Sequence, residues 1–179
     1  MKTILESLRV LLVLTVLTGF AYPLVVTGVA RIAFRDAATG SIVKQGTSEV
    51  GSALLAQKTE SPKYFWPRPS GGDFATVASG ASNKGPTSAD LVKSIAERRE
   101  KFGKDAPDEL LTASGSGLDP HLSPAAAKHQ APRVATERKI PIGKVTALID
   151  QLTEGPQLGF LGEPRVNVLS LNLALDAMK

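Results

Sequence analysis

An unbroken apolar run near the N-terminus constrains this chain more than any other feature. Residues 10–30 are 21 consecutive positions without Asp, Glu, Lys, Arg or His, and Arg9 and Arg31 flank them. As a helix the run rises roughly 31 Å, which matches a bilayer hydrocarbon core of about 30 Å. Because no second run of this kind follows, the rest of the chain must lie on one side of the membrane. The sequence therefore predicts a short arm (1–9), a transmembrane helix (10–30) and one aqueous domain (31–179).

A cleaved secretory signal is the alternative interpretation of this run. Residues 1–9 are basic, and residues 28–30 loosely match a small-residue cleavage site. The apolar core of a signal is usually only about 7–15 residues long, whereas this run is longer and ends against Arg31 and Arg35, as a stop-transfer segment does. We therefore expect the helix to be retained, with a kink near Tyr22-Pro23, where proline removes a backbone donor.

Small residues within the span suggest packing against other helices. Gly19 and Gly28 would let a neighbouring helix approach closely, and Tyr22 and Pro23 are further candidates for transmembrane packing. The alternative is that all four residues simply face lipid.

The charge distribution leaves the orientation open and excludes one class of partner. The formal net charge is +4, but residues 1–35 hold four basic residues and Glu6, so the remainder carries 17 basic and 16 acidic residues. Basic residues lie on both sides of the span, and the positive-inside rule therefore does not decide its orientation. A nearly neutral domain argues against a nucleic-acid surface. The absence of cysteine excludes disulfides and thiolate metal sites.

The first half of the aqueous domain is expected to contain little regular structure. Residues 41–43 and 49–50 are possible strand fragments, and residues 60–84 form a loop rich in proline and glycine. Thr87 or Ser88 can cap an amphipathic helix that continues to about residue 102.

The second half contains stronger helix signals. Ser123-Pro124 is a good helix start, and we expect that helix to continue until Pro132 disturbs it. The spacing of apolar residues from 145 to 152 predicts another helix that stops at Gly155-Pro156. Residues 166–168 suggest a short strand, whereas residues 171–178 fit either a strand or a helix. This mixture of helices and strands predicts a small α/β domain of the mixed α+β type.

Motifs that carry enzyme chemistry are incomplete in this chain. Residues 80–87 imitate a phosphate-binding loop, but Pro86 occupies the lysine position. Ser114, Asp119 and His121 are the ingredients of a serine hydrolase without the glycine spacing of a nucleophile elbow. The two histidines, His121 and His129, do not complete a metal site. We therefore expect no catalytic or metal-ligating residue.

Two clusters remain after these motifs are set aside. The first cluster, which we call the aromatic-proline segment, comprises Tyr64, Phe65, Trp66, Arg68, Pro69 and Ser70. Large aromatic side chains with polar ends, followed by an arginine on a stiff proline-flanked backbone, suit a partner-docking surface. Packing inside the domain is an equally weighted alternative, because a single tryptophan in a small domain is often part of the core.

The second cluster, which we call the serine-glycine loop, reads as a structural loop. Its candidate residues are Ser114, Gly115, Ser116, Gly117 and Asp119. We expect the glycines to permit a tight loop that leads into the Ser123 cap, with Asp119 bonding local amides. A ligand site is the less favoured alternative.

Together these features resemble the C subunit of the Kdp high-affinity potassium-transporting P-type ATPase over nearly the whole chain. Seven motifs occur in the order of that family. They are Tyr22-Pro23 in the apolar run, then residues 51–57, 64–70, 79–83, 111–121, 130–135 and 166–176.

The resemblance implies membership of a complex in the bacterial inner membrane. In that complex a channel-like A subunit carries potassium and a P-type B subunit hydrolyses ATP, and a small accessory subunit is a further candidate partner. The C subunit has one span and an extracytoplasmic, periplasmic domain. This chain lacks the Asp-Lys-Thr-Gly-Thr phosphorylation motif, and one helix cannot enclose a selectivity filter. We therefore expect an assembly, stabilising and regulatory subunit without a cofactor of its own, in a complex that handles ATP and potassium elsewhere.

Two other functions stay open at this point. The family is also described as a catalytic chaperone that raises the ATP affinity of the B subunit through a transient complex of both subunits and ATP. That role conflicts with a domain outside the cytoplasm, and residues 140–144 lack the serine and glutamine of the Leu-Ser-x-x-Gln pattern of some relatives. An unrelated membrane-anchored enzyme is the second alternative.

Overall fold

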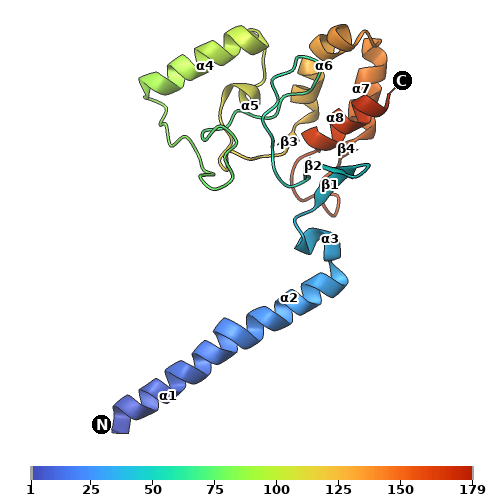
Figure 1. The fold of residues 1–179 in the computed structure, drawn as a ribbon. Coiled ribbons are helices and arrows are strands. Elements are labelled where there is room, and N and C mark those ends of the chain that lie inside the picture. The colour runs from blue at the N-terminus through green and yellow to red at the C-terminus, as the bar shows by residue number, and fades with distance from the viewer. Residues whose placement is uncertain (1, 179) are drawn as a thin grey trace. The chain divides into compact units, whose positions relative to one another are not determined.

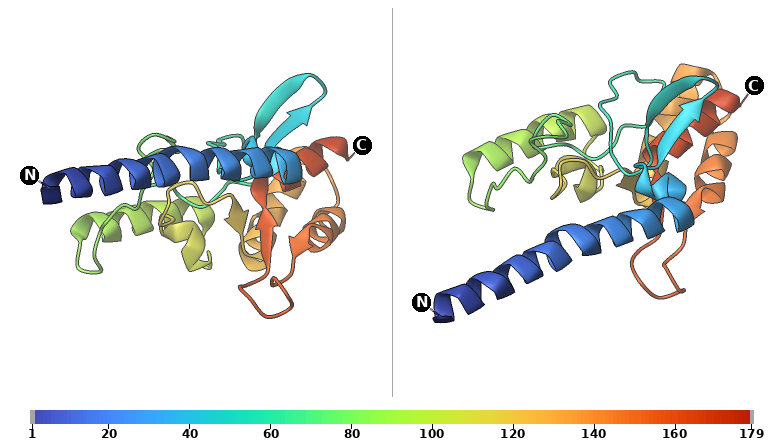
Figure 2. Two further views of the ribbon diagram at one scale, coloured as in Figure 1. Left: turned by 90° about the horizontal axis from the view of Figure 1, so that it is seen from below. Right: turned by 60° about the horizontal axis from the view of Figure 1, so that its bottom comes forward.

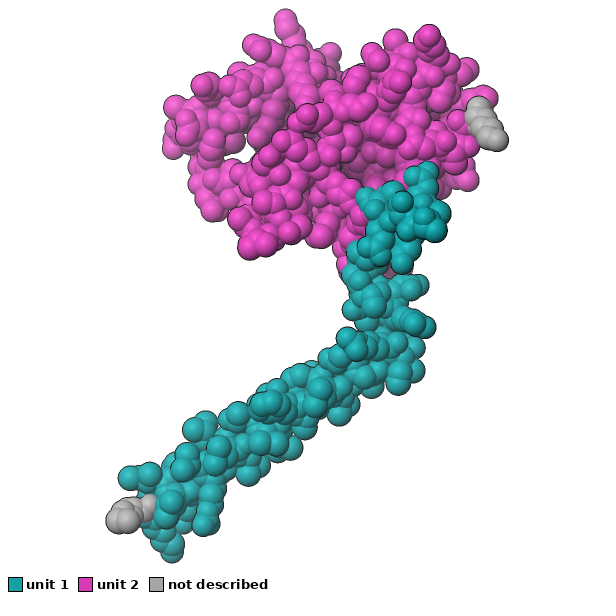
Figure 3. Space-filling model, viewed as in Figure 1, with its two compact units in different colours: residues 1–50 teal, residues 51–179 magenta. Residues whose placement is uncertain are grey.

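The chain divides into two compact units. The computed structural model describes residues 2–178. One unit comprises residues 1–50 and the other residues 51–179 (Figure 3).

The first unit is dominated by one long apolar helix. Three consecutive segments build it without a break (Figure 1): α1 (Lys2–Val16), the π-helical turn η1 (Leu17–Ala21) and α2 (Tyr22–Ala33). The helix has 32 residues, is long and apolar enough to cross a membrane, and buries no residue within the chain. Its length of roughly 48 Å exceeds the apolar run at both ends. A short helix, α3 (Arg35–Ala38), follows.

The π-helical turn accounts for the way in which the helix accommodates Pro23. Proline lacks an N–H and its ring crowds the carbonyl four residues earlier, which here belongs to Gly19. The turn over residues 17–21 widens the helix at this point, and the Tyr22 N–H bonds to the Leu17 carbonyl, five residues back. The helix is therefore continuous through the proline by way of a π turn over residues 17–21, and the kink expected near Tyr22-Pro23 stays a prediction.

A hairpin and a long loop precede the helices of the second unit. β1 (Ile42–Gln45) and β2 (Ser48–Ser52) form a two-stranded sheet, which confirms both strand fragments. Residues 53–88 contain neither helix nor strand, as the proline and glycine content predicts. α4 (Ala89–Phe102) follows Ser88, and both its predicted ends are confirmed. A single-turn helix, α5 (Asp108–Leu111), leads to the serine-glycine loop.

Three helices and a small antiparallel sheet hold the core of the second unit. The helices are α6 (Pro124–Arg138), α7 (Ile142–Gln151) and α8 (Val168–Ala177), and the strands are β3 (His121–Leu122), β4 (Thr153–Glu154) and β5 (Arg165–Asn167). β5 is the central strand, with Leu122 and Thr153 both opposite Val166. The three helices gather beside this sheet, whereas α4 lies at the far end of the unit (Figure 1, Figure 2). The core includes Phe65, Leu110, Val134, Ile149 and Leu171, all with no exposed surface.

Helix α6 begins as predicted but does not end at Pro132. The Ser123 hydroxyl accepts a hydrogen bond from the Ala126 N–H at 3.1 Å, and Pro124 occupies the first helical position. The helix then continues through Pro132 to Arg138, so the predicted interruption is wrong. Pro132 is exposed, whereas Ala131 and Val134 beside it are buried. Packing of the buried face therefore outweighs the loss of one hydrogen bond on the solvent side.

Two further boundaries differ from the sequence expectation. α7 ends at Gln151, earlier than the expected stop at Gly155-Pro156, because Thr153 and Glu154 pair with β5. The ambiguous C-terminal segment is a helix. Asn167 caps it by accepting from the Ser170 N–H at 3.0 Å, so Val168 belongs to α8 and not to the strand before it.

Replacing Pro132 by alanine should stabilise the protein. Alanine restores the missing donor in the middle of α6 and removes the ring clash, and the position is exposed, so we expect a gain of about 1–3 kcal/mol. Thermal unfolding of the full chain in detergent, followed by circular dichroism, measures it. Pro124→Ala at the first helical position is the matched control and should change stability by less than about 0.5 kcal/mol. Equal effects of the two substitutions would contradict this account of α6.

Candidate functional site

The aromatic-proline segment is held by two side-chain amides that pair with its backbone. The Phe65 N–H donates to Asn172 Oδ1 at 2.8 Å, and Asn172 Nδ2 donates back to the Phe65 carbonyl at 3.0 Å. The Trp66 N–H donates to Gln130 Oε1 at 3.0 Å, and Gln130 Nε2 donates to the Trp66 carbonyl at 2.9 Å. Each amide bonds the segment as an adjacent β-strand would. α6 and α8 thereby satisfy the buried backbone of a segment that has no strand neighbour.

The Trp66 ring lies between two cations. Arg133 Cζ is 3.7 Å and Lys101 Nζ is 4.0 Å from the ring centroid. Phe102 meets the same ring edge-on, with centroids 5.6 Å apart, and the indole N–H donates to the Ser61 carbonyl at 3.0 Å. The tryptophan therefore joins α4 to α6, and its ring faces are occupied within the domain.

Arg133 links this segment to α6 by several hydrogen bonds. Its guanidinium donates to the carbonyls of Pro62 and Tyr64, the latter at 3.1 Å, and to Gln130 Oε1 at 2.7 Å. Burial lowers the pKa of Arg133 to about 10, with the charge of Glu137 acting in the opposite direction. The group is still charged near neutral pH, and these three oxygen acceptors compensate its partial loss of water.

Tyr64 is tied to the last helix. Its hydroxyl donates to Asp176 Oδ2 at 3.0 Å, and Arg138 pairs with the other oxygen of the same carboxylate at 2.7 Å. The Arg138 guanidinium also lies 4.7 Å from the Tyr64 ring centroid. Tyr64, Phe65 and Trp66 thus all serve internal packing, with Phe65 fully buried and the other two partly exposed.

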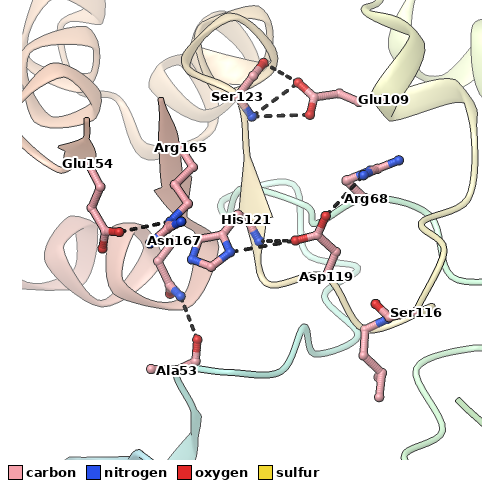
Figure 4. Close-up of polar contacts among 11 residues, drawn as sticks. Ala53, Arg68, Glu109, Ser116, Asp119, His121, Ser123, Glu154, Arg165 and Asn167 are labelled. Carbon is pink, nitrogen blue, oxygen red and sulfur yellow. Dashed lines mark hydrogen bonds and ion pairs between the residues drawn. The ribbon is translucent and has the colours of Figure 1, made fainter. Parts of the chain in front are cut away.

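Arg68, Pro69 and Ser70 connect the segment to the serine-glycine loop. Arg68 Nη1 is 3.1 Å from Asp119 Oδ2, and the Ser114 N–H donates to the Pro69 carbonyl at 2.9 Å. The Asp119 carboxylate also accepts from the His121 N–H at 3.0 Å (Figure 4). The two clusters singled out in the sequence therefore lie side by side, although about 50 residues separate them along the chain.

The loop needs glycine at one position. Gly117 has φ +69°, and a Cβ atom there would lie 2.9 Å from the Gly80 carbonyl oxygen. Beside it, Ser70 Oγ accepts from the N–H groups of Gly72 and Phe74, at 3.2 and 2.9 Å. Ser114 is buried, whereas Gly115 and Ser116 are exposed. The close approach of two chain segments explains why this loop is rich in small residues.

Polar contacts around the loop are local and structural. Ser116 Oγ accepts from the Leu118 N–H at 3.1 Å, and the Ser123 hydroxyl and N–H both bond the Glu109 carboxylate. Asn167 Nδ2 donates to the Ala53 carbonyl at 2.8 Å (Figure 4). A hollow of about 410 Å³ beside the loop is lined by residues that include Leu54, Ser114 and Asp119. Because Arg68 already neutralises Asp119, this hollow has no free negative charge to attract a cation.

The structure places the residues of the incomplete enzyme motifs, and in the hydrolase-like set His121 Nδ1 lies 3.8 Å from Asp119 Oδ1. Residues 80–87 form an irregular loop, and no strand leads into it from residue 53 onward, so the strand–loop–helix frame of a phosphate-binding loop is missing. Among residues 2–178 no group of three His, Cys, Asp or Glu side chains is placed to hold a metal ion. The His129 ring bonds the Phe102 carbonyl at 2.7 Å, in a structural contact between α6 and the end of α4.

The helix of the first unit leaves its candidate packing residues open. A Cβ at Gly28 would meet no atom within 4 Å, and one at Gly19 would make only an ordinary contact with Thr15, at 3.9 Å. Tyr22 is 67% exposed, and Pro23 lies in the first turn of α2. Nothing in this unit covers these residues, and their packing against another helix stays a prediction.

Three contributors to the site were not singled out in the sequence. Gln130, Arg133 and Asn172 lie in two of the seven ordered motifs, residues 130–135 and 166–176, but none of the three was a candidate by itself. A usable signal exists for the two amides. Each is a polar residue on an otherwise apolar helix face, Gln130 beside Ala131 and Asn172 beside Leu171. Buried carboxamides of this kind require partners, and an exposed-looking loop elsewhere in the chain can supply them.

The comparisons with known proteins decide the family. The family model described as KdpC, the c chain of the K⁺-transporting ATPase, matches residues 4–177. The chain belongs to the KdpC family. It is 48% identical over 186 residues to the potassium-transporting ATPase KdpC subunit of Rhodospirillum rubrum, covering 98% of this chain and 96% of that protein. The KdpC subunits of Paraburkholderia phytofirmans and Geobacter sulfurreducens are 47% and 46% identical, each covering 99% of its own length and 100% and 99% of this chain.

Family membership confirms the resemblance drawn from the seven motifs. As a KdpC subunit, the chain is an accessory subunit of the potassium-transporting ATPase complex, and its apolar N-terminal helix is consistent with membrane anchoring.

Replacing Asn172 by leucine should destabilise the protein strongly. Leucine fills a similar volume but leaves the buried N–H and carbonyl of Phe65 without partners, so we expect a loss of about 2–4 kcal/mol. Urea unfolding of the full chain in detergent measures the change. Ser170→Ala on the exposed side of the same helix is the control and should stay within about 0.5 kcal/mol of the parent protein. A leucine variant as stable as the control would show that the amide clamp contributes little.

Proposed function

We propose that this KdpC chain is a non-catalytic subunit that assembles, stabilises and regulates the potassium-transporting complex. Potassium conduction belongs in this proposal to a channel-like A subunit, and ATP hydrolysis to a P-type B subunit. A small accessory subunit is the third candidate partner. The chain itself needs no cofactor for this role, since ATP and potassium are handled by the complex.

The internal contacts made by the residues of the two clusters support the proposal. Their chemically capable side chains are engaged in holding the domain together: Arg68 with Asp119, Tyr64 with Asp176, and Trp66 between Lys101 and Arg133. A catalytic site instead needs a nucleophile, base or charge stabiliser directed at a substrate. A rigid scaffold that presents its outer surface to partner subunits is consistent with this arrangement.

In this proposal only some residues of the aromatic-proline segment face a partner. Phe65 cannot contact a partner, because it is fully buried. Its burial instead fixes the positions of the partly exposed Tyr64, Trp66 and Arg68, whose outer edges remain accessible. The segment therefore contributes to a partner surface mainly through its rigidity.

We place the domain outside the cytoplasm in this proposal, with the span in the bacterial inner membrane. The resemblance to the family implies that the large C-terminal part lies in the periplasm, which supports this placement. This placement separates the domain from cytoplasmic ATP and so favours an accessory role over direct modulation of nucleotide affinity.

External protease should therefore digest the domain in intact cells whose outer barrier has been permeabilised. A C-terminal tag followed by immunoblotting detects the cleavage, and a cytoplasmic protein in the same cells reports that the inner membrane stays sealed. Protection under these conditions, together with digestion in inverted membrane vesicles, would reverse the orientation and make direct contact with ATP possible.

Replacing both Gly19 and Gly28 by leucine should weaken assembly. The span remains apolar enough to insert, but two large side chains block close approach of a neighbouring helix, and lipid provides no hydrophobic drive to compensate. We expect recovery of the chain with the complex, purified through a tag on another subunit, to fall about tenfold.

The matched control for this experiment exchanges residues of similar size in the same span. Val13→Leu and Val25→Leu together should leave recovery unchanged, since neither opens nor closes a gap. Unchanged recovery and unchanged potassium-stimulated ATPase activity in the glycine variant would show that the glycines face lipid, and would leave the domain as the main contact.

A further inference from the structure

The connection between β4 and β5 carries a cluster of large apolar side chains at the surface. We call residues 156–162 the apolar turn. Leu158 is 83% exposed, Phe160 74% and Leu161 49%. The connection projects from the rest of its unit (Figure 2). Single exposed apolar residues are common, but three within four consecutive positions form a patch that requires an explanation.

The apolar turn has a defined backbone. Gln157 and Leu161 pair across it, with N–H to carbonyl distances of 2.8 Å in one direction and 2.9 Å in the other. Gly159 has φ +84°, and Leu158 has φ +54°, which is unfavourable for a leucine. The turn therefore holds its apolar side chains outward in a fixed arrangement, which reduces the entropy lost when they are bound.

The charges around the turn distinguish a protein partner from a lipid surface. Residues 156–162 contain no charged side chain, and Glu154 and Arg165, which flank the turn in the sequence, pair with each other at 3.1 Å. Glu163 remains as the neighbouring charge outside that pair. Segments that bind a bilayer surface usually combine aromatic residues with lysine or arginine, and a net acidic neighbourhood is repelled by anionic headgroups.

The size of the patch excludes a self-sufficient interface. Three side chains of this kind bury at most a few hundred Å², whereas a stable complex buries about 800 Å² on each partner. A second copy of the chain would therefore not be held by this turn alone. A small, rigid apolar contact is effective when other contacts already keep the partner close, as they do in a multisubunit membrane complex.

We propose that the apolar turn inserts into an apolar socket on another subunit of the transport complex, on the side of the membrane that carries this domain. Leu158 and Phe160 are the anchoring side chains. This inference rests on the accessory role proposed above, and it adds the contact surface and the chemistry of the partner site. Once buried in the socket, a cluster of this size can supply the few strong contacts that dominate an interface.

The double substitution Leu158→Asn with Phe160→Asn tests this contact. Asparagine tolerates the left-handed conformation at position 158, so the turn should keep its shape while losing its apolar surface. We expect the amount of chain retained on the complex, purified through another subunit and washed extensively, to fall about tenfold. Thermal unfolding of the variant by itself should match that of the parent protein.

Val77→Asn with Val92→Gln is the matched control. These valines are 101% and 61% exposed and lie in other parts of the same domain, so the control removes apolar surface without touching the turn. Retention of the control should equal that of the parent chain. Equal retention of all three proteins, or equal loss from both variants, would overturn the proposed contact. Failure of the unsubstituted chain to co-purify would instead overturn the accessory role.

A Phe160→Trp variant separates a protein socket from a bilayer. Its added tryptophan emission, taken as the difference from the parent protein, should shift to shorter wavelength in the assembled complex. In vesicles of phosphatidylethanolamine and phosphatidylglycerol that contain this chain alone, the emission should remain that of an exposed tryptophan. Quenching there by brominated acyl chains would show that the turn enters lipid, and would overturn the socket.

Discussion

Two buried carboxamides hold the backbone of Phe65 and Trp66, and the arrangement of the domain depends on them. Gln130 on α6 and Asn172 on α8 each supply one donor and one acceptor to an extended segment that has no strand beside it. With the segment fixed, Phe65 enters the core, Tyr64 reaches Asp176 on α8, and the Trp66 ring reaches α4. The same segment positions Arg68 against Asp119 and so orders the serine-glycine loop. The two carboxamides specify a unique arrangement because each is paired in both directions with the backbone of the segment.

This organisation explains how a small domain with long irregular stretches has a defined surface. Residues 53–88 contain no helix or strand, yet their path is set by side chains from α6 and α8 and by the close approach of Gly117 to Gly80. In the role proposed for it, the subunit acts by presenting a fixed surface, and rigidity lowers the entropy lost on assembly. The apolar turn between β4 and β5 follows the same logic, since its backbone pairing fixes two exposed anchors in advance.

The helix of the first unit and the domain of the second differ in how they relate to partners. Every residue of the helix is unburied within the chain, so its apolar surface must be covered by lipid or by other helices. The domain already buries its own core, and its partners contact only what remains outside. Anchoring in a membrane requires hydrophobic length alone, whereas the specific assembly that we propose uses particular shapes, such as the open glycines of the helix and the apolar turn of the domain.

Local composition and an ordered set of motifs are sufficient to predict the apolar helix, the strand fragments near residues 42 and 50, the starts of α4 and α6, and the family. The sequence also marked both clusters, although it could not show that they lie together or that Phe65 is buried. The tertiary structure alone decided that α6 continues through Pro132, that α7 ends early to let Thr153 pair with β5, and that residues 168–177 are helical. For α6 and α7, contacts between residues distant in the chain outweighed the local preference. Residues 168–177 fitted both states locally, and the Asn167 cap together with the burial of Leu171 and Leu175 in the core selected the helix. The buried pairing of Gln130 and Asn172 with one loop likewise joins residues distant in the chain.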